Sequence, residues 1–328
     1  MTARTMSVLG CLVVVLLVIS APSWSKDKYI KPLTNDGPSW PKDISLQPFV
    51  LAYRGAGTIE TKLVEVKSAV EREGFQVVGE YAPFKGAYVV VVTSDALRNN
   101  AVKSTFGAYG AVQRIALSQV SKEELQVAYT NPRYMAQAYR MKDDLGNTAA
   151  KLQKALGKMG VFGSKEGFLA EKLRTYQYMC LYMFMPAFTD HIALARYPSQ
   201  EEALRVVESN LAEGKGGTTR VYRVDLPGKQ ETVLGVGMRA GAGADETIMK
   251  AIDIGELKSL AHLPYELIVS DGTIYMLNIK FRNPVNFPDL SMGTFMAIKD
   301  SPADIEQTFR QVAGGTENTS FGDCMPSR

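Results

Sequence analysis

The chain has 328 residues, of which 46% are hydrophobic and 22% charged, and its formal net charge is +3. These values are typical of a globular protein of about two domains, and they exclude collagenous and disordered chains. The Lys and Arg residues are scattered along the chain, so the sequence predicts no nucleic-acid partner.

Residues 1–25 have the pattern of a signal peptide. Arg4 precedes a short apolar run, and Ser23-Trp24-Ser25 places small residues where a signal peptidase reads them, so we expect cleavage before Lys26. The apolar run is shorter than the roughly 20 residues that span a bilayer. An uncleaved anchor is the alternative. We expect a mature chain without a membrane span, exported to the periplasm or the extracellular space.

Two stretches indicate an internal duplication. Alternating apolar side chains over 125–129 end at Asn131-Pro132, and a similar run over 273–281 ends at Asn283-Pro284. Alternation predicts half-buried strands, and proline ends a strand because it lacks the N–H that a ladder needs. At one constant offset, 127 and 129 match 279 and 281.

Helical patterns repeat in the same order. Two sets of apolar residues match between the halves: Leu63, Val66 and Val70 with Leu204, Val207 and Leu211, and Leu152, Leu156 and Met159 with Ile305, Phe309 and Val312. Strands and helices are therefore expected in the same order in both halves. The sequence predicts an α+β fold of two tandem pseudo-symmetric units, each a small mostly antiparallel sheet packed with helices.

The expected organisation has six parts. They are a signal peptide (1–25), an extended N-terminal arm (26–48), a first α+β unit (49–160), a Met-rich connector (161–191), a second α+β unit (192–314) and a C-terminal tail (315–328). Within the first unit, the nearly all-apolar run AYVVVVT at 87–93 predicts an interior strand. In the second unit, Gly235, Gly237 and Gly241 depart from the dinucleotide-binding spacing, and we expect a flexible loop there.

Several of these motifs resemble the bacterial domain-of-unknown-function family 302. They are VVVVTSDALRNNAV and VAYTNP in the first half, and LPYELIVSDGTIYMLNIKFRNP in the second. The resemblance implies a compact α+β fold for most of both halves, excluding the arm and the connector. It implies no activity, because the family has no established reaction.

Polar and aromatic residues lie just past the predicted strand ends and are candidates for a ligand site at the seam between the units. They are Asn131, Arg133, Tyr139, Arg140, Asn283, Phe287 and Asp289. The alternative is that the asparagines cap turns and the arginines pair with surface carboxylates.

The connector carries soft potential ligands, namely Met179, Cys180, Met183, Met185 and His191. Thioether and thiolate groups select Cu(I), so a copper site is one hypothesis. Methionine also fills irregular gaps in cores, and core packing is the other interpretation. Cys180 and Cys324 are the only cysteines of the mature chain, and an even pair in an oxidising compartment predicts a disulfide between them.

The sequence contains no recognisable nucleophile–base pair or metal-binding motif. We therefore expect a non-enzymatic protein that binds an unknown small molecule or protein partner and needs no cofactor. The alternatives are a copper or redox accessory protein and an unrecognised hydrolase.

Overall fold

The computed structural model describes residues 44–180 and 183–315, which form two units and a connector. The first unit is an antiparallel sheet in the order β3-β4-β5-β6-β2-β7. Its elements are β2 (Phe49–Ala56), α1 (Ile59–Arg72), β3 (Gln76–Tyr81), β4 (Ala87–Thr93), α2 (Asp95–Val102), the 3₁₀ helix η2 (Gly107–Gly110), β5 (Gln113–Gln119), β6 (Glu124–Thr130), α3 (Pro132–Ala138), α4 (Gly146–Leu156) and β7 (Gly160–Phe162). The run AYVVVVT forms β4 between β3 and β5, so the prediction of an interior strand is confirmed.

The second unit is an antiparallel sheet in the order β11-β15-β14-β13-β12. Its elements are β11 (Ile192–Arg196), α6 (Gln200–Ala212), the 3₁₀ helix η3 (Lys215–Gly217), β12 (Thr218–Asp225), β13 (Glu231–Met238), α7 (Asp245–Ile252), the 3₁₀ helix η4 (Leu260–His262), β14 (Tyr265–Ser270), β15 (Thr273–Met276), α8 (Ile279–Asn286), α9 (Met292–Ala297) and α10 (Ser301–Val312). Gly235 and Gly237 lie within β13, so the flexible loop expected at these glycines is wrong.

The two units share one topology, as predicted. Strands β2 to β6 correspond to β11 to β15, and they hold the same places in their sheets. The ladders are irregular at corresponding places, between Leu51 and Tyr53 and between Ala193 and Ala195. A second shared irregularity separates 77 from 79 and 220 from 222. Bulges are retained features of related sheets, so they support a duplication independently of the strand order.

The predicted match between the two Asn-Pro pairs is wrong. Asn131 occupies the N-cap of α3 directly after β6, whereas Asn283 and Pro284 lie inside α8, whose N-cap is Asn278. The hairpin before these residues explains the error. Residue 118 pairs with 126 in the first unit and 270 with 273 in the second, so the offset between the units changes from 152 to 147.

The predicted strand over 273–281 therefore ends at Met276. The Asn278 side chain accepts a hydrogen bond from the Lys280 N–H at 3.0 Å, and helix α8 begins at Ile279. Ile279, Phe281 and Val285 are all buried. Buried apolar residues two and four positions apart fit both a strand and a short helix, and the cap selects the helix.

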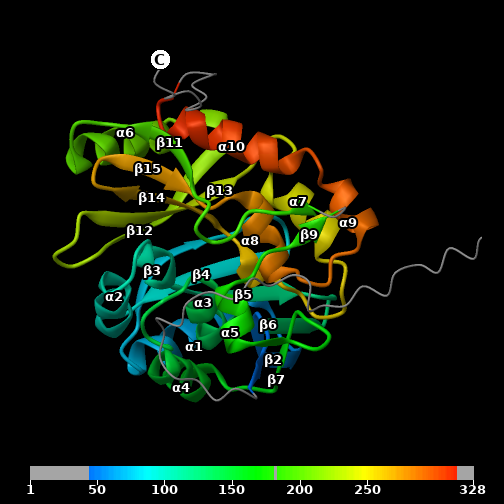
Figure 1. Ribbon diagram of the computed structural model, residues 1–328. Helices are drawn as coiled ribbons and strands as arrows, with labels where there is room; N and C mark the ends of the chain where they lie inside the picture. Colours follow the sequence, from blue (N-terminus) through cyan, green and yellow to red (C-terminus); the bar gives the residue numbers. More distant parts are fainter. Residues whose placement is uncertain (1–43, 181–182, 316–328) are drawn as a thin grey trace, which may run out of the picture.

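The two sheets face each other between two layers of helices (Figure 1). Helices α1 and α4 pack on the outer side of the first sheet, and α6 and α10 on the outer side of the second. Edge strand β3 packs against edge strand β12. A Cβ atom at Gly79 would lie 2.2 Å from the Val221 carbonyl oxygen, so glycine is required for this approach. The two units are thus in direct contact along β3 and β12.

Helices α1 and α6 of the outer layers begin with equivalent caps. Thr58 accepts a hydrogen bond from the Thr61 N–H, and Ser199 accepts one from the Glu202 N–H. The predicted matches in α1 and α6 hold, but Met159 lies beyond the end of α4 and is exposed. Among the helices of residues 44–180 and 183–315, none has the length and apolar character needed to cross a membrane.

The connector between the units contains short elements. They are β8 (Phe168–Leu169), α5 (Ala170–Arg174), β9 (Met179–Cys180) and β10 (Met183–Phe184), and β8 pairs with β1 (Ser45–Leu46). Strand β7 extends the first sheet on the far side of β2.

Candidate functional site

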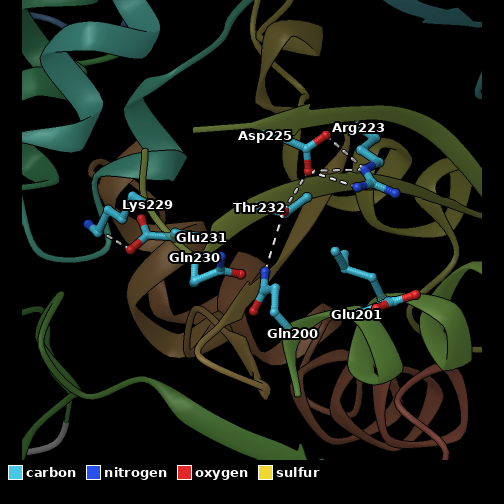
Figure 2. Close-up of a pocket in the computed structure, with 9 residues that line it drawn as sticks. Gln200, Glu201, Arg223, Asp225, Lys229, Gln230, Glu231 and Thr232 are labelled. Carbon is cyan, nitrogen blue, oxygen red and sulfur yellow. Dashed lines mark hydrogen bonds and ion pairs between the residues drawn. The ribbon is translucent and has the colours of Figure 1, made fainter. Parts of the chain in front are cut away.

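An open pocket of about 310 Å³ lies between the start of α6 and the hairpin that joins β12 to β13 (Figure 2). Its volume is at the lower end of the range typical of small-molecule sites, about 300–1,000 Å³. The lining residues are Gln200, Glu201, Leu204, Arg223, Asp225, Lys229, Gln230, Glu231 and Thr232.

The hairpin side of the pocket is attached to the first unit. Lys229 Nζ forms an ion pair with Glu231 at 2.8 Å and donates to the Ser104 carbonyl at 2.8 Å. The other carboxylate oxygen of Glu231 accepts the Ala108 N–H at 2.9 Å. These contacts cross between the units, so the first unit holds this wall of the pocket in place.

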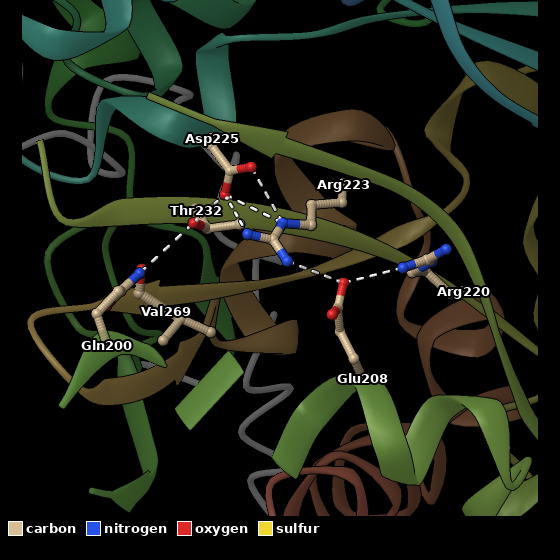
Figure 3. A network of polar contacts seen from close by, with 7 residues as sticks. All are labelled: Gln200, Glu208, Arg220, Arg223, Asp225, Thr232 and Val269. Carbon is tan, nitrogen blue, oxygen red and sulfur yellow. Dashed lines mark hydrogen bonds and ion pairs between the residues drawn. The ribbon is translucent and has the colours of Figure 1, made fainter. Parts of the chain in front are cut away.

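The opposite wall is a polar network over β12, β13 and α6 (Figure 3). Arg223 binds Asp225 through Nη2 at 2.9 Å and Glu208 through Nη1 at 3.1 Å. Thr232 donates to Asp225 at 2.6 Å, and the Gln200 amide donates to the Val269 carbonyl at 3.0 Å. The side chains are therefore positioned by one another before any ligand enters.

Charges of both signs face the pocket from separate sides. Figure 2 shows Lys229 and Glu231 on one side and Arg223 and Asp225 on another, with Glu201 on the first turn of α6. The Glu201 carboxylate is exposed and has no hydrogen-bond partner within the described residues. An ammonium group has three N–H donors, of which Lys229 uses two, so one remains for a ligand.

Four of the predicted ligand residues follow β6, and the structure separates them. Asn131 donates to the Gln47 carbonyl at 2.9 Å, and Arg133 lies beside Asp144 near Gly146. Tyr139 is buried at the seam. Arg140 donates to the Arg174 carbonyl at 2.7 Å, and burial lowers the pKa of its guanidinium.

The other three follow β15. Asn283 accepts a hydrogen bond from the Tyr265 hydroxyl at 2.9 Å, and the Phe287 ring lies edge-on to His262 with the ring centres 5.1 Å apart. Asp289 accepts the Lys165 N–H at 2.5 Å. Tyr139, Asn283 and Phe287 are buried beside the seam between the units. None of the seven predicted ligand residues lines the pocket of Figure 2.

A buried charged network at the seam was not predicted from the sequence. Arg114 of β5 donates to one oxygen of Glu266 on β14, and Arg282 of α8 binds the other oxygen at 3.2 Å. Arg282 also donates to the His262 carbonyl at 2.6 Å and contacts His262 Nδ1 at 3.1 Å. The sequence did contain a signal for this network, because the apolar strands VQRIALS and YELIV each carry a single charged residue.

His191, one of the hypothetical copper ligands, lies in an aromatic cluster. Its ring stacks on Phe106 with centres 3.9 Å apart and on Tyr109 at 5.6 Å. Burial lowers its pKa to about 4, so the imidazole is neutral at pH 7.

The other copper candidates are only partly described. Met185 is half-buried, whereas the side chains of Met179, Cys180 and Met183 lie outside the described residues, as do residue 324 and residues 1–43. The copper, disulfide and signal-peptide hypotheses therefore stay predictions. Within the part of the chain that the structure describes, no three His, Cys, Asp or Glu side chains converge as metal ligands.

No protein-family model, no curated protein and no solved structure matches this chain. The candidate site is therefore defined by its geometry alone.

Proposed function

We propose that this chain is a non-enzymatic binding protein that takes a small zwitterionic molecule, such as a free amino acid or a short peptide, into the pocket of Figure 2. The observation that supports this function is that the Glu201 carboxylate and the remaining N–H of Lys229 face one pocket from different sides. A ligand that carries an ammonium group and a carboxylate at opposite ends matches that pattern.

The two ends of the ligand have different partners. The exposed Glu201 carboxylate accepts the ligand ammonium, since no described side chain occupies it. On the other side of the pocket, the remaining N–H of Lys229 donates to the ligand carboxylate. Gln230 and Thr232 contribute neutral polar atoms between them.

The proposal also includes export, with a mature chain beginning at Lys26, and the resemblance to domain-of-unknown-function family 302. The signal-like segment at 1–25 supports the first and the quoted motifs support the second. Intact-mass measurement of exported protein tests the cleavage site, and retention of the first 25 residues contradicts it.

Calorimetric titration with glycylglycine tests the binding function. We expect the zwitterion to bind at least ten-fold more tightly than its N-acetylated and C-amidated forms, because each modification removes one charged end. Glu201→Gln weakens binding about ten-fold, the loss of one charge-assisted hydrogen bond. Glu60→Gln on α1 is the matched control, since Glu60 holds the equivalent helix position in the first unit. Equal affinity for all three ligands, or no heat with any of them, contradicts the proposal.

A further inference from the structure

The interior of the seam contains a row of residues that ends at the charged network. Tyr222 of β12 pairs with Gly235 of β13, which pairs with Glu266 of β14. A Cβ atom at Gly235 would lie 2.0 Å from the Tyr222 ring, so this ring lies across the glycine in the direction of Glu266. In the first unit, Gly79 and Arg114 occupy the ends of the corresponding row.

Four polar atoms around this row are buried and make no close hydrogen bond within the described residues. They are the hydroxyls of Tyr109, Tyr139 and Tyr222 and the Nε of Arg114. The four side chains are at most 2% exposed. Such atoms are rare in folded proteins, because burial without a partner costs the hydration of the group.

The four groups lie in one place. The ring centres of Tyr109 and Tyr139 are 6.0 Å apart, and the Tyr139 hydroxyl lies within hydrogen-bonding range of the Arg114 guanidinium. Burial, together with the Glu266 carboxylate, raises the pKa of both Tyr109 and Tyr222, so these phenols keep their protons and can donate. The three hydroxyls and the Arg114 guanidinium therefore surround one region of the seam, and the hydroxyls of Tyr109 and Tyr222 have no acceptor among the described residues.

The buried charges there do not balance. Arg114 and Arg282 share the single carboxylate of Glu266. Burial and these two arginines lower the pKa of His262, which is a sign of positive potential around that ring. Glu231 is paired with Lys229, and the cation that acts on Asp245 is Arg239. An unmatched positive charge in a buried site is unfavourable and attracts an anion.

We propose that the seam binds one small monovalent anion, of the size of a halide or formate, held by the hydroxyls of Tyr109, Tyr139 and Tyr222 and the Nε–H of Arg114. The anion accepts all four donors and compensates the second arginine. It stabilises the joined pair of units and is independent of the pocket on the second unit.

Thermal unfolding of the mature chain in bromide tests this site, with the ionic strength held constant by a large anion such as gluconate. We expect the midpoint to rise with the logarithm of the bromide concentration, by roughly 5 °C between 1 and 100 mM for millimolar affinity. Tyr222→Phe removes one donor and flattens this dependence. In bromide-free buffer the same variant unfolds at a midpoint no lower than that of the wild type, because an unpartnered hydroxyl is lost.

Tyr134→Phe is the matched control. Its hydroxyl is buried and donates to the Val285 carbonyl at 2.6 Å, and it is not one of the four donors. We expect this variant to have a lower thermal unfolding midpoint at every bromide concentration, with the same dependence of the midpoint on bromide as the wild type. Anomalous diffraction from a bromide-soaked crystal gives a second readout, with a peak expected within hydrogen-bonding distance of Tyr222 Oη. A thermal unfolding midpoint that does not change with bromide concentration overturns the proposal. So does a water molecule near Tyr222 Oη with no anomalous peak.

Discussion

The two units keep the same interaction with opposite signs. In the first, Lys67 of α1 pairs with Glu80 of β3 at 3.1 Å, and in the second, Glu208 of α6 pairs with Arg223 of β12 at 3.1 Å. The helix and strand positions correspond, but the charges are exchanged. The comparison shows that a duplicated unit retains the contact while its residues change, provided that the partners change together.

At the seam the corresponding positions have become partners of each other. Arg114 and Glu266 hold equivalent places on β5 and β14, 152 positions apart, and they form the central ion pair. Gly79 lies against its own equivalent, Tyr222. Identical residues at 114 and 266 would place like charges in contact, and identical large residues at 79 and 222 would clash. The units can therefore pack together only because their residues differ at these equivalent positions.

The largest expected effect is at that ion pair. Glu266→Gln leaves two buried guanidinium groups without a carboxylate, and we expect it to lower the free energy of unfolding by about 3–5 kcal/mol. Glu80→Gln, in the partly exposed pair of the first unit, costs about 1 kcal/mol or less. Urea unfolding measures the free energy of unfolding of both variants. Equal losses in the two would contradict the expectation that the buried ion pair matters more.

Exchanging the two charges sharpens the same comparison. The double variant Arg114→Glu and Glu266→Arg is expected to remain destabilised, since Arg282 would then face an arginine at position 266. Met135 holds the position in the first unit that corresponds to Arg282, so no cation there compensates. If the double variant recovered wild-type stability, the Arg282–Glu266 contact would not contribute to the stability of the network.

Helices α2 and α7 both begin with an aspartate, but only the second is buried. Burial raises the pKa of Asp245 to about 7, from an ordinary value of 3.8. Between those two values the folded chain holds a proton that the unfolded chain has lost. Stability therefore falls as the pH rises through this window, by about 1.4 kcal/mol per pH unit.

Asp245→Asn should remove most of this dependence and stabilise the chain at pH 8. Asp95→Asn, at the exposed equivalent, should leave it unchanged. Asp253, whose pKa burial raises to about 6, contributes the same slope over a narrower pH range in both variants. Urea unfolding at pH 4 and pH 8 measures how much the free energy of unfolding of each variant changes with pH. If Asp245→Asn shows the same change as the wild type, Asp245 is not the group responsible.

The close approach of β3 to β12 predicts a steric effect. Gly79→Ala places a Cβ atom against the Val221 carbonyl and should cost about 1–3 kcal/mol. Gly160→Ala in β7 is the control, because no atom lies within 4 Å of its added Cβ. A thermal midpoint of Gly79→Ala equal to that of the control would mean that the strands separate without penalty.

The smallest effects are expected at the two Asn-Pro pairs. Pro132 starts α3, where its fixed backbone is favourable, so Pro132→Ala costs about 1 kcal/mol or less. Pro284 lies inside α8, and Pro284→Ala is expected to be neutral or slightly stabilising, since it restores a helical N–H. Chemical unfolding of both variants tests the difference in sign.

Periodicity predicted the topology because it reports the buried face of each element. The matches of Val66 with Val207 and Val70 with Leu211 survive in the structure. The Asn-Pro match failed because one hairpin is longer, and a constant offset cannot detect a length change inside a loop. The pocket was missed for a different reason. Its residues lie on α6, β12, β13 and the hairpin between them, and their convergence depends on the fold.

Hydrogen exchange in the presence of glycylglycine tests most directly whether the second unit alone carries the ligand site. We expect slower exchange at amides 226–232 and 200–204, which border the pocket, and no change at the corresponding segments 82–88 and 59–63 of the first unit. Protection of both units, or of neither, would contradict the account.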